Sequence, residues 1–211
     1  MTGDPGSTDD LLRRAGAGDP HALAELFARY HGRLRRMVQL RLDRRLQGRV
    51  DPSDVLQEAQ LEIFRRAADY AADPRVPPFL WLRLITGQRL MALHRRHLGA
   101  QMRSAGQEIA LHRGPIPQAT SLSLAEMLLG RLTSPTRAFQ RAEMQLRIQE
   151  ALNRMDPIDR EVLVLRHFEE LSNAETAQAL GLEKTAASNR YIRALKRLRE
   201  VLAGLPGCFE A

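Results

Sequence analysis

The chain of 211 residues contains a single cysteine, Cys208, which excludes an internal disulfide framework and a cysteine-based zinc site. No stretch approaches the run of about 18 apolar residues that a membrane-spanning helix requires, so we expect no membrane insertion. Aromatic residues make up only 5% of the chain, which argues against a large β-sandwich. Runs of β-branched residues bounded by turn residues do not occur either, so strand signals are missing.

The sequence also lacks the motifs of common catalytic sites. It has no glycine-rich phosphate loop and no nucleophile elbow, so we expect no enzyme activity, catalytic residue or cofactor. Residues 1–10 are acidic and rich in small residues, without the basic and apolar segments of a signal peptide. We therefore expect a disordered N-terminus at 1–10 and a protein of the reducing cytoplasm.

Positive charge is in excess. The chain has 32 Lys and Arg against 25 Asp and Glu, a net charge of +7. Such a balance favours an anionic partner, most often nucleic acid, although excess charge also serves solubility.

Apolar residues recur at spacings of three and four, and Asp-Pro pairs that start helices stand at Asp19, Asp51 and Asp156. Gly and Pro concentrate in the middle of the chain, where only 124–132 could make a short helix. The pattern predicts an all-α protein of two small helical domains, 11–100 and 136–205, joined by a flexible linker at 101–135, with a tail at 206–211.

The strongest local pattern is a helix-turn-helix near the C-terminus. A short helix, 174–180, would end at Gly181, and a second helix would follow over 184–199. This second helix has six basic residues and no acidic one. Its apolar face would comprise Ala187, Tyr191, Ala194, Leu195 and Leu198. Thr185, Ser188 and Asn189 could read bases, and the basic residues could hold phosphates; the alternative is a solvated basic face. The candidate DNA-binding residues are Lys184, Thr185, Ser188, Asn189, Arg190, Arg193, Lys196 and Arg197.

An acidic cluster interrupts the basic first block. Asp51, Asp54, Glu58 and Glu62 follow one another at spacings of three and four, so their carboxylates share one helical face. A basic partner surface or the neighbouring arginines could compensate the repulsion between these negative charges. Alternatively, Asp51 could simply cap the helix. A metal site with His94 and His97 is disfavoured, because both histidines lie in a basic run that repels cations.

At this point the chain resembles the bacterial RNA polymerase sigma factors of the extracytoplasmic-function (ECF) class. Residues 51–58, DPSDVLQE, resemble the D-x-x-D-x-x-Q-E helix of region 2, and 79–96 resemble its following segment. Residues 152–202 resemble region 4, and two tracts within it resemble the planctomycete branch most.

The resemblance implies an alternative sigma factor that directs RNA polymerase to specific promoters. Asp51, Asp54, Gln57 and Glu58 would bind the β′ coiled coil of core polymerase. The −10 element would be held by Arg83, Gln88, Arg89, Arg95 and Arg96. Region 4 would bind the −35 element and the β flap, and an anti-sigma factor is a further candidate partner.

The sequence departs from the family pattern at some positions. Gln88 and Ala92 stand where many members carry Asn and Asp, so base preference does not carry over. Glu183 replaces the common Ser cap, and we expect Thr185 to serve instead. The alternatives are a stand-alone helix-turn-helix regulator, which would bind two-fold half-sites, and a helical adaptor protein.

Overall fold

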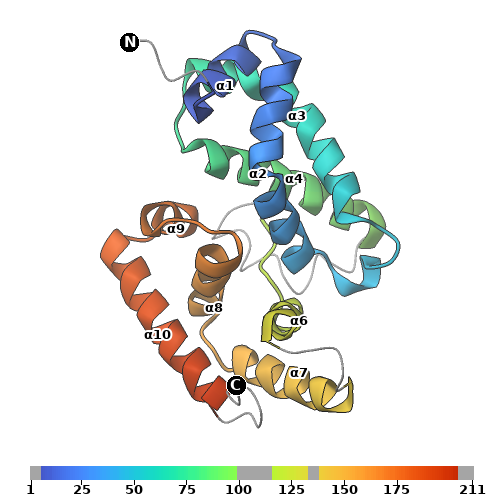
Figure 1. Cartoon of the computed structure of the whole chain (residues 1–211), viewed down its shortest axis with the longest axis vertical. Helices are drawn as coiled ribbons and strands as arrows, with labels where there is room; N and C mark the ends of the chain where they lie inside the picture. The colour runs from blue at the N-terminus through green and yellow to red at the C-terminus, as the bar shows by residue number, and fades with distance from the viewer. Residues whose placement is uncertain (1–5, 99–115, 133–137, 204–211) are drawn as a thin grey trace. The chain divides into compact units, whose positions relative to one another are not determined.

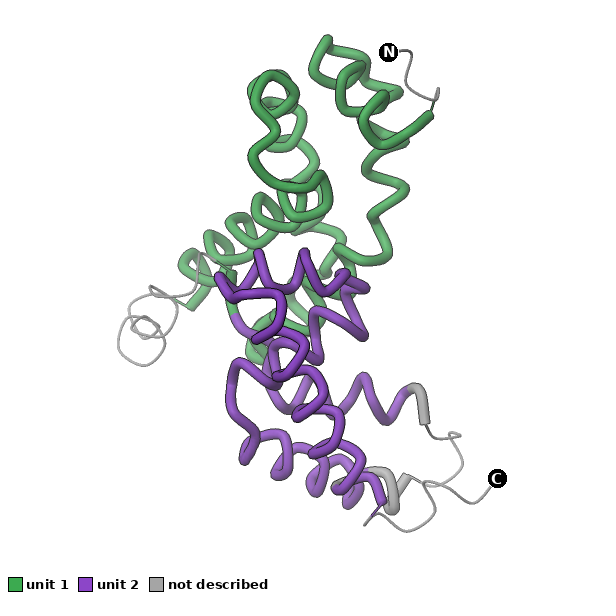
Figure 2. The backbone as a smooth tube through the Cα atoms, turned by 90° about the vertical axis from the view of Figure 1, so that its left-hand side faces the viewer, with its two compact units in different colours: residues 1–117 green, residues 118–211 purple. Residues whose placement is uncertain are grey.

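The computed structural model describes residues 6–98, 116–132 and 138–203. The chain forms two compact units, 1–117 and 118–211 (Figure 2). Helices dominate both, and the described residues contain no strand, which confirms the all-α prediction (Figure 1).

The described residues of unit 1 form four helices and one short turn. They are α1 (Thr8–Gly16), α2 (Pro20–Arg41), the 3₁₀ turn η1 (Arg44–Leu46), α3 (Pro52–Ala72) and α4 (Pro78–Leu98). Asp19 and Asp51 cap α2 and α3 as predicted. Ser7 caps α1 by accepting a hydrogen bond from the backbone N–H of Asp10, so the helix begins inside the stretch 1–10 expected to be disordered.

The core of unit 1 lies between α1, α2, α3 and α4. It contains Leu11, Leu26, Leu34, Met37, Leu56, Ile63, Phe79, Leu82 and Ile85, all at most 2% exposed. At Gly16, an added Cβ would lie 2.7 Å from the Cβ of Ala71, so α1 approaches α3 too closely for a side chain there. Trp81 stacks on Tyr70 with ring centroids 4.2 Å apart, which places this tryptophan in the core rather than on a base-binding surface.

Unit 2 contains α6 (Ser121–Leu132), α7 (Ala138–Asn153), α8 (Pro157–Leu163), the π-helical turn η3 (Val164–Phe168), α9 (Asn173–Leu180) and α10 (Lys184–Ala203). The predicted cap Asp156 accepts hydrogen bonds from the backbone N–H groups of Ile158 and Asp159 at the start of α8.

Helix α6 falls within the segment expected to be a linker, yet it packs as part of unit 2. Leu124, Ala125 and Leu129 are buried, and α6 contacts α7. The guanidinium of Arg160 on α8 also donates to the hydroxyl of Ser121 at 2.8 Å. Of the expected linker, residues 101–115 and 133–135 lie outside the described part of the chain, as does the tail 206–211.

Candidate functional surfaces

The turn between α9 and α10 has the geometry of a helix-turn-helix. The side chain of Ser172 and that of Glu175 form a reciprocal capping box at the start of α9. Gly181 ends α9 in the left-handed conformation, with φ 63° and ψ 37°, as predicted. The side-chain amide of Asn173 donates to the carbonyl of Lys184 at 2.9 Å, which ties the start of α9 to the start of α10.

Helix α10 has a buried inner face and an exposed outer face. Ala187 and Ala194 are fully buried, while Thr185, Asn189 and Lys196 are exposed, so the predicted division of this helix is confirmed. The helix begins at Lys184, which leaves Thr185 inside the first turn instead of at the cap. The polar residues at its start therefore point away from the core, where a major groove could receive them.

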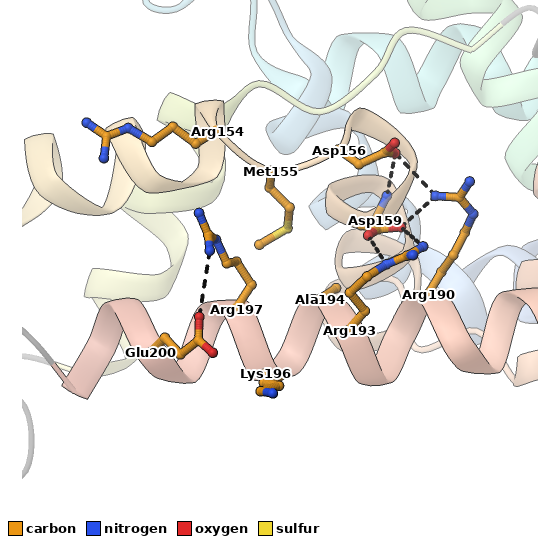
Figure 3. Close-up of a pocket in the computed structure, with 10 residues that line it drawn as sticks. All are labelled: Arg154, Met155, Asp156, Asp159, Arg190, Arg193, Ala194, Lys196, Arg197 and Glu200. Atoms are coloured by element: carbon orange, nitrogen blue, oxygen red, sulfur yellow. Dashed lines mark hydrogen bonds and ion pairs between the residues drawn. The ribbon is translucent and has the colours of Figure 1, made fainter.

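Two of the basic residues of α10 are bound to a carboxylate of α8. Asp159, whose side chain is 5% exposed, accepts hydrogen bonds from Arg190 at 2.6 Å and from the Nε of Arg193 at 2.7 Å (Figure 3). The hydrogen bond that Arg193 donates to Asp159, together with the negative charge of that carboxylate, raises the pKa of Arg193. Because this pairing is intramolecular, Arg190 and Arg193 are less free to bind phosphate than the sequence suggested.

A hollow of about 500 Å³ lies between the α7–α8 turn and α10 (Figure 3). Its lining carries five basic residues and three acidic ones: Arg154, Arg190, Arg193, Lys196, Arg197, Asp156, Asp159 and Glu200. Arg197 is 3.8 Å from Glu200, and no ion pair joins Lys196 to any carboxylate in the described part of the chain. Lys196 and Arg154 are both exposed and have no ion pair in that part of the chain, so they are the cations of this group most available to an external anion.

The acidic cluster in unit 1 lies at the start of α3. Asp51 and Asp54 form a capping box, in which Asp54 accepts from the backbone N–H of Asp51 at 3.2 Å. Hydrogen bonds from the hydroxyl and backbone N–H of Ser53 lower the pKa of Asp51. The capping interpretation of Asp51 is therefore confirmed, but Asp54 and Gln57 remain exposed and available to a partner.

Neighbouring arginines compensate the other two carboxylates. Glu58 is 3.4 Å from Arg96, and Glu62 pairs with Arg65, Arg66 and Arg89. Burial acts to raise the pKa of Glu62, but the hydrogen bond from Arg66 and the charges of the three arginines outweigh it, so the pKa is lowered. In contrast, no ion pair reaches Asp54 among the residues that the structure describes.

The residues expected to hold a −10 element lie on α4, where helical spacing places Gln88, Arg89, Arg95 and Arg96 on one side and Arg83 on the opposite, buried side. Arg95 and Arg96 are exposed, while Gln88 and Arg89 are half-buried. Gln88 accepts a hydrogen bond from Arg66 at 3.3 Å, and Arg89 lies 3.5 Å from Glu62. These contacts join the α4 residues to the acidic helix α3.

Arg83 differs from the expectation, since it is only 6% exposed. It lies between Leu82 and Thr86 on the part of α4 that packs into unit 1, and both of these residues are fully buried. A side chain in this position cannot hold a DNA phosphate, so we remove Arg83 from the candidate DNA-binding residues.

His94 is a core histidine. It is 2% exposed, and its Nε2 accepts a hydrogen bond from the backbone N–H of Asp43 at 3.2 Å. Burial lowers its pKa, which favours the neutral ring. The described residues contain no group of three metal-ligating side chains close enough to hold an ion.

Sequence reasoning missed three exposed apolar side chains on these helices. Leu61 on α3 is 63% exposed, Phe64 is 46% exposed, and Ile192 on α10 is 64% exposed. Their spacing along each helix, which places them away from the buried residues, could have indicated that they are exposed. Asp159 was missed for another reason, because only tertiary packing brings it to Arg190 and Arg193.

Comparisons with known proteins identify a matching family and relatives of this chain. Residues 145–198, from α7 through most of α10, match the protein family described as sigma-70, region 4. The chain is 28% identical to the RNA polymerase sigma factor NccH of Alcaligenes xylosoxydans xylosoxydans over 205 residues, which cover 94% of this chain and 96% of the relative. It is 27% identical to the ECF RNA polymerase sigma factor SigK of Mycobacterium ulcerans over 217 aligned positions, which span both chains completely.

A solved structure supports the fold. The structure of CnrH in complex with the cytosolic domain of CnrY aligns with 93% of this chain and 97% of that chain, with a TM-score of 0.55 and 21% sequence identity. Within the described segments, no helix is both long and apolar enough to cross a membrane.

Proposed function

We infer that this protein is an alternative RNA polymerase sigma factor of the ECF family, which the region 4 match and the full-length relatives support. It directs RNA polymerase to specific promoters for transcription initiation. The observation that carries this function is α10, which has no acidic residue from Lys184 to Arg199 and stands second in a helix-turn-helix inside the matched span.

We assign core polymerase binding to the exposed start of α3, through Asp51, Asp54, Gln57 and Glu58. The unpaired charge of Asp54 favours a basic partner, for which the β′ coiled coil is our candidate. Leu61 and Phe64 continue this side of α3 over the next two turns, and their exposure adds apolar area to the same surface. An apolar patch edged by carboxylates is typical of a protein–protein interface.

We assign binding of the −10 element to Gln88, Arg89, Arg95 and Arg96 on α4. Arg95 is exposed, and the pairs of Arg89 and Arg96 with Glu62 and Glu58 are long, at 3.5 and 3.4 Å. The Arg96–Glu58 pair is the more exposed of the two, and a surface pair of this kind contributes little stability, about 0–1 kcal/mol, so a DNA phosphate can replace it at small cost.

We assign binding of the −35 element to the outer face of α10. Thr185, Ser188 and Asn189 would read base edges, while Lys184, Lys196 and Arg197 would hold phosphates. Arg190 and Arg193 act chiefly by fixing α10 to α8 through Asp159. The apolar side of this unit would meet the β flap.

The remaining features of the proposal follow from this role. Sigma factors act by binding rather than catalysis, so the protein is not an enzyme and needs no cofactor. It works in the cytoplasm, where polymerase is, and an anti-sigma factor is a candidate regulator. The tracts 169–175 and 186–198 favour the planctomycete branch of the family.

Two weak DNA-binding units become effective when polymerase holds both. Once one unit binds its element, the second element is presented at a high effective concentration, so overall affinity exceeds that of either unit. The protein thus needs no tight promoter binding of its own.

Run-off transcription tests the function. Core RNA polymerase is mixed with a library of random promoters, with and without the purified chain. We expect discrete transcripts only in the presence of the chain, and cloned start sites that share two upstream elements. Identical transcription with and without the chain would refute the assignment.

A further inference from the structure

The outer face of α10 contains one apolar residue among polar ones. Ile192 is 64% exposed, although the face lies opposite the fully buried Ala187 and Ala194. Spacings of three and four place Ile192 in line with Thr185, Ser188, Asn189 and Lys196. It therefore occupies the centre of the row that faces outward from the helix-turn-helix.

Distances along the helix separate the residues of this row into two groups. With a rise of 1.5 Å per residue, Thr185 and Ile192 are about 10.5 Å apart, within a major groove about 12 Å wide. Lys196 is about 16.5 Å from Thr185, beyond the groove width, where the phosphate backbone lies. Ile192 is thus the last residue of the row that can face base edges.

The chemistry of this side chain selects its contact. Ile192 has no hydrogen-bonding group, so it can recognise only an apolar feature of a base edge. The major groove offers one such feature, the C5 methyl group of thymine. The surrounding helix has no carboxylate from Lys184 to Arg199, so nothing in this row repels the DNA backbone.

We propose that Ile192 contacts the C5 methyl group of one thymine in the promoter element bound by α10, and so determines specificity at that position. This inference rests on the proposed function. Replacing thymine by uracil removes the methyl group alone and leaves base pairing intact. Burial of one methyl group contributes about 0.8 kcal/mol, which corresponds to about fourfold in affinity.

The test uses the full chain bound to core polymerase. Promoter duplexes are selected from a random library, and each thymine of the upstream element is then replaced by uracil, one at a time. At one thymine, we expect about fourfold weaker binding of the wild type. Ile192→Ala should bind the thymine and uracil probes equally, and Ile192→Val should keep most of the difference.

Leu146→Ala is the matched control, because Leu146 is also exposed, at 56%, but lies on α7. It should retain the wild-type uracil profile. A wild type insensitive to every uracil, a selected element without thymine, or an Ile192→Ala variant that keeps the difference would overturn the inference while leaving the sigma function intact. If no duplex is selected, the proposed function fails, and this inference fails with it.

Discussion

Asp159 binds Arg193 through two hydrogen bonds, at 2.7 Å to Nε and 3.2 Å to a terminal nitrogen, although the two residues are 34 positions apart in the chain. The carboxylate is almost fully buried, whereas the Arg193 side chain is 62% exposed. Asp159 therefore fixes the orientation of α10 on α8 while leaving part of the guanidinium at the surface.

Removing this carboxylate should destabilise unit 2. Asp159→Ala leaves Arg190 without its buried partner, and we expect a loss of about 1–3 kcal/mol in the free energy of unfolding. Urea denaturation followed by circular dichroism measures it. Glu200→Gln is the control, because its pair with Arg197 is exposed and 3.8 Å long, and it should change stability by less than about 1 kcal/mol. Equal losses of stability in the two variants would show that Asp159 does not hold α10 on α8.

Two glycine substitutions in unit 2 should have opposite signs. Gly181 has a φ of 63°, so Gly181→Ala should cost about 1–2 kcal/mol through backbone strain, although no atom lies within 4 Å of the added Cβ. Gly130 lies in helix α6 with equally open space, so Gly130→Ala should stabilise by about 0.5 kcal/mol. Thermal unfolding of both variants measures the two changes in stability. A stabilising effect of Gly181→Ala would contradict the left-handed conformation at this position.

The charge of Asp54 should strengthen polymerase binding. Asp54→Asn keeps a side-chain oxygen for the backbone N–H of Asp51 but removes the charge, so folding is preserved while affinity for core polymerase falls several-fold at low salt. Asp69→Asn, also exposed on α3 but four turns away, should bind as the wild type does. Titration of labelled chain with core polymerase measures both, and unchanged affinity of Asp54→Asn would place the interface elsewhere.

The salt dependence of promoter binding should identify the phosphate contacts. Lys196 has no carboxylate partner among the described residues, so Lys196→Ala should reduce the slope of log affinity against log salt by about 0.9. Arg147 on α7 is paired with Glu143, and Arg147→Ala should leave the slope unchanged. Binding of holoenzyme to promoter DNA over a range of salt concentrations gives both slopes. If the two variants behave alike, Lys196 does not contact phosphate.

Unit 1 should lose stability in mild acid. Burial lowers the pKa of His94 below its ordinary value of 6.5, so the unfolded chain binds a proton there that the folded chain does not. The resulting stability is complete above pH 6.5 and is lost as the pH falls towards the folded pKa. Trp81, the chain's one tryptophan, lies in this core and reports unfolding by fluorescence. His94→Gln should flatten the change between pH 7.5 and 5.5, whereas a pH-independent wild type would contradict the prediction.

Local signals predicted much of this structure. The Asp-Pro caps at Asp19, Asp51 and Asp156 and the left-handed Gly181 depend on residues close in sequence, so they could be read directly. The buried face of α10 followed from its spacing, with Ala187 and Ala194 fully buried as predicted.

The structure differs from the sequence predictions where contacts between residues far apart in the chain determine the packing. Helix α4 is apolar around much of its circumference, with Leu80, Trp81 and Leu82 all buried, so its sequence could not show that Arg83 also faces inward. Helix α6 has its apolar positions in a stretch flanked by Gly and Pro, and its contact with α7 and the hydrogen bond from Arg160 to Ser121 stabilise it. Likewise, the pairing of Asp159 with Arg190 and Arg193 depends on how α8 crosses α10.

Binding of a labelled promoter duplex tests the central claim most directly. Its fluorescence anisotropy is measured with the chain alone, with core polymerase alone and with both together. A sigma factor should give tight, sequence-specific binding only when both are present. Tight binding by the chain alone to a duplex with two-fold half-sites would contradict the account and identify a stand-alone regulator.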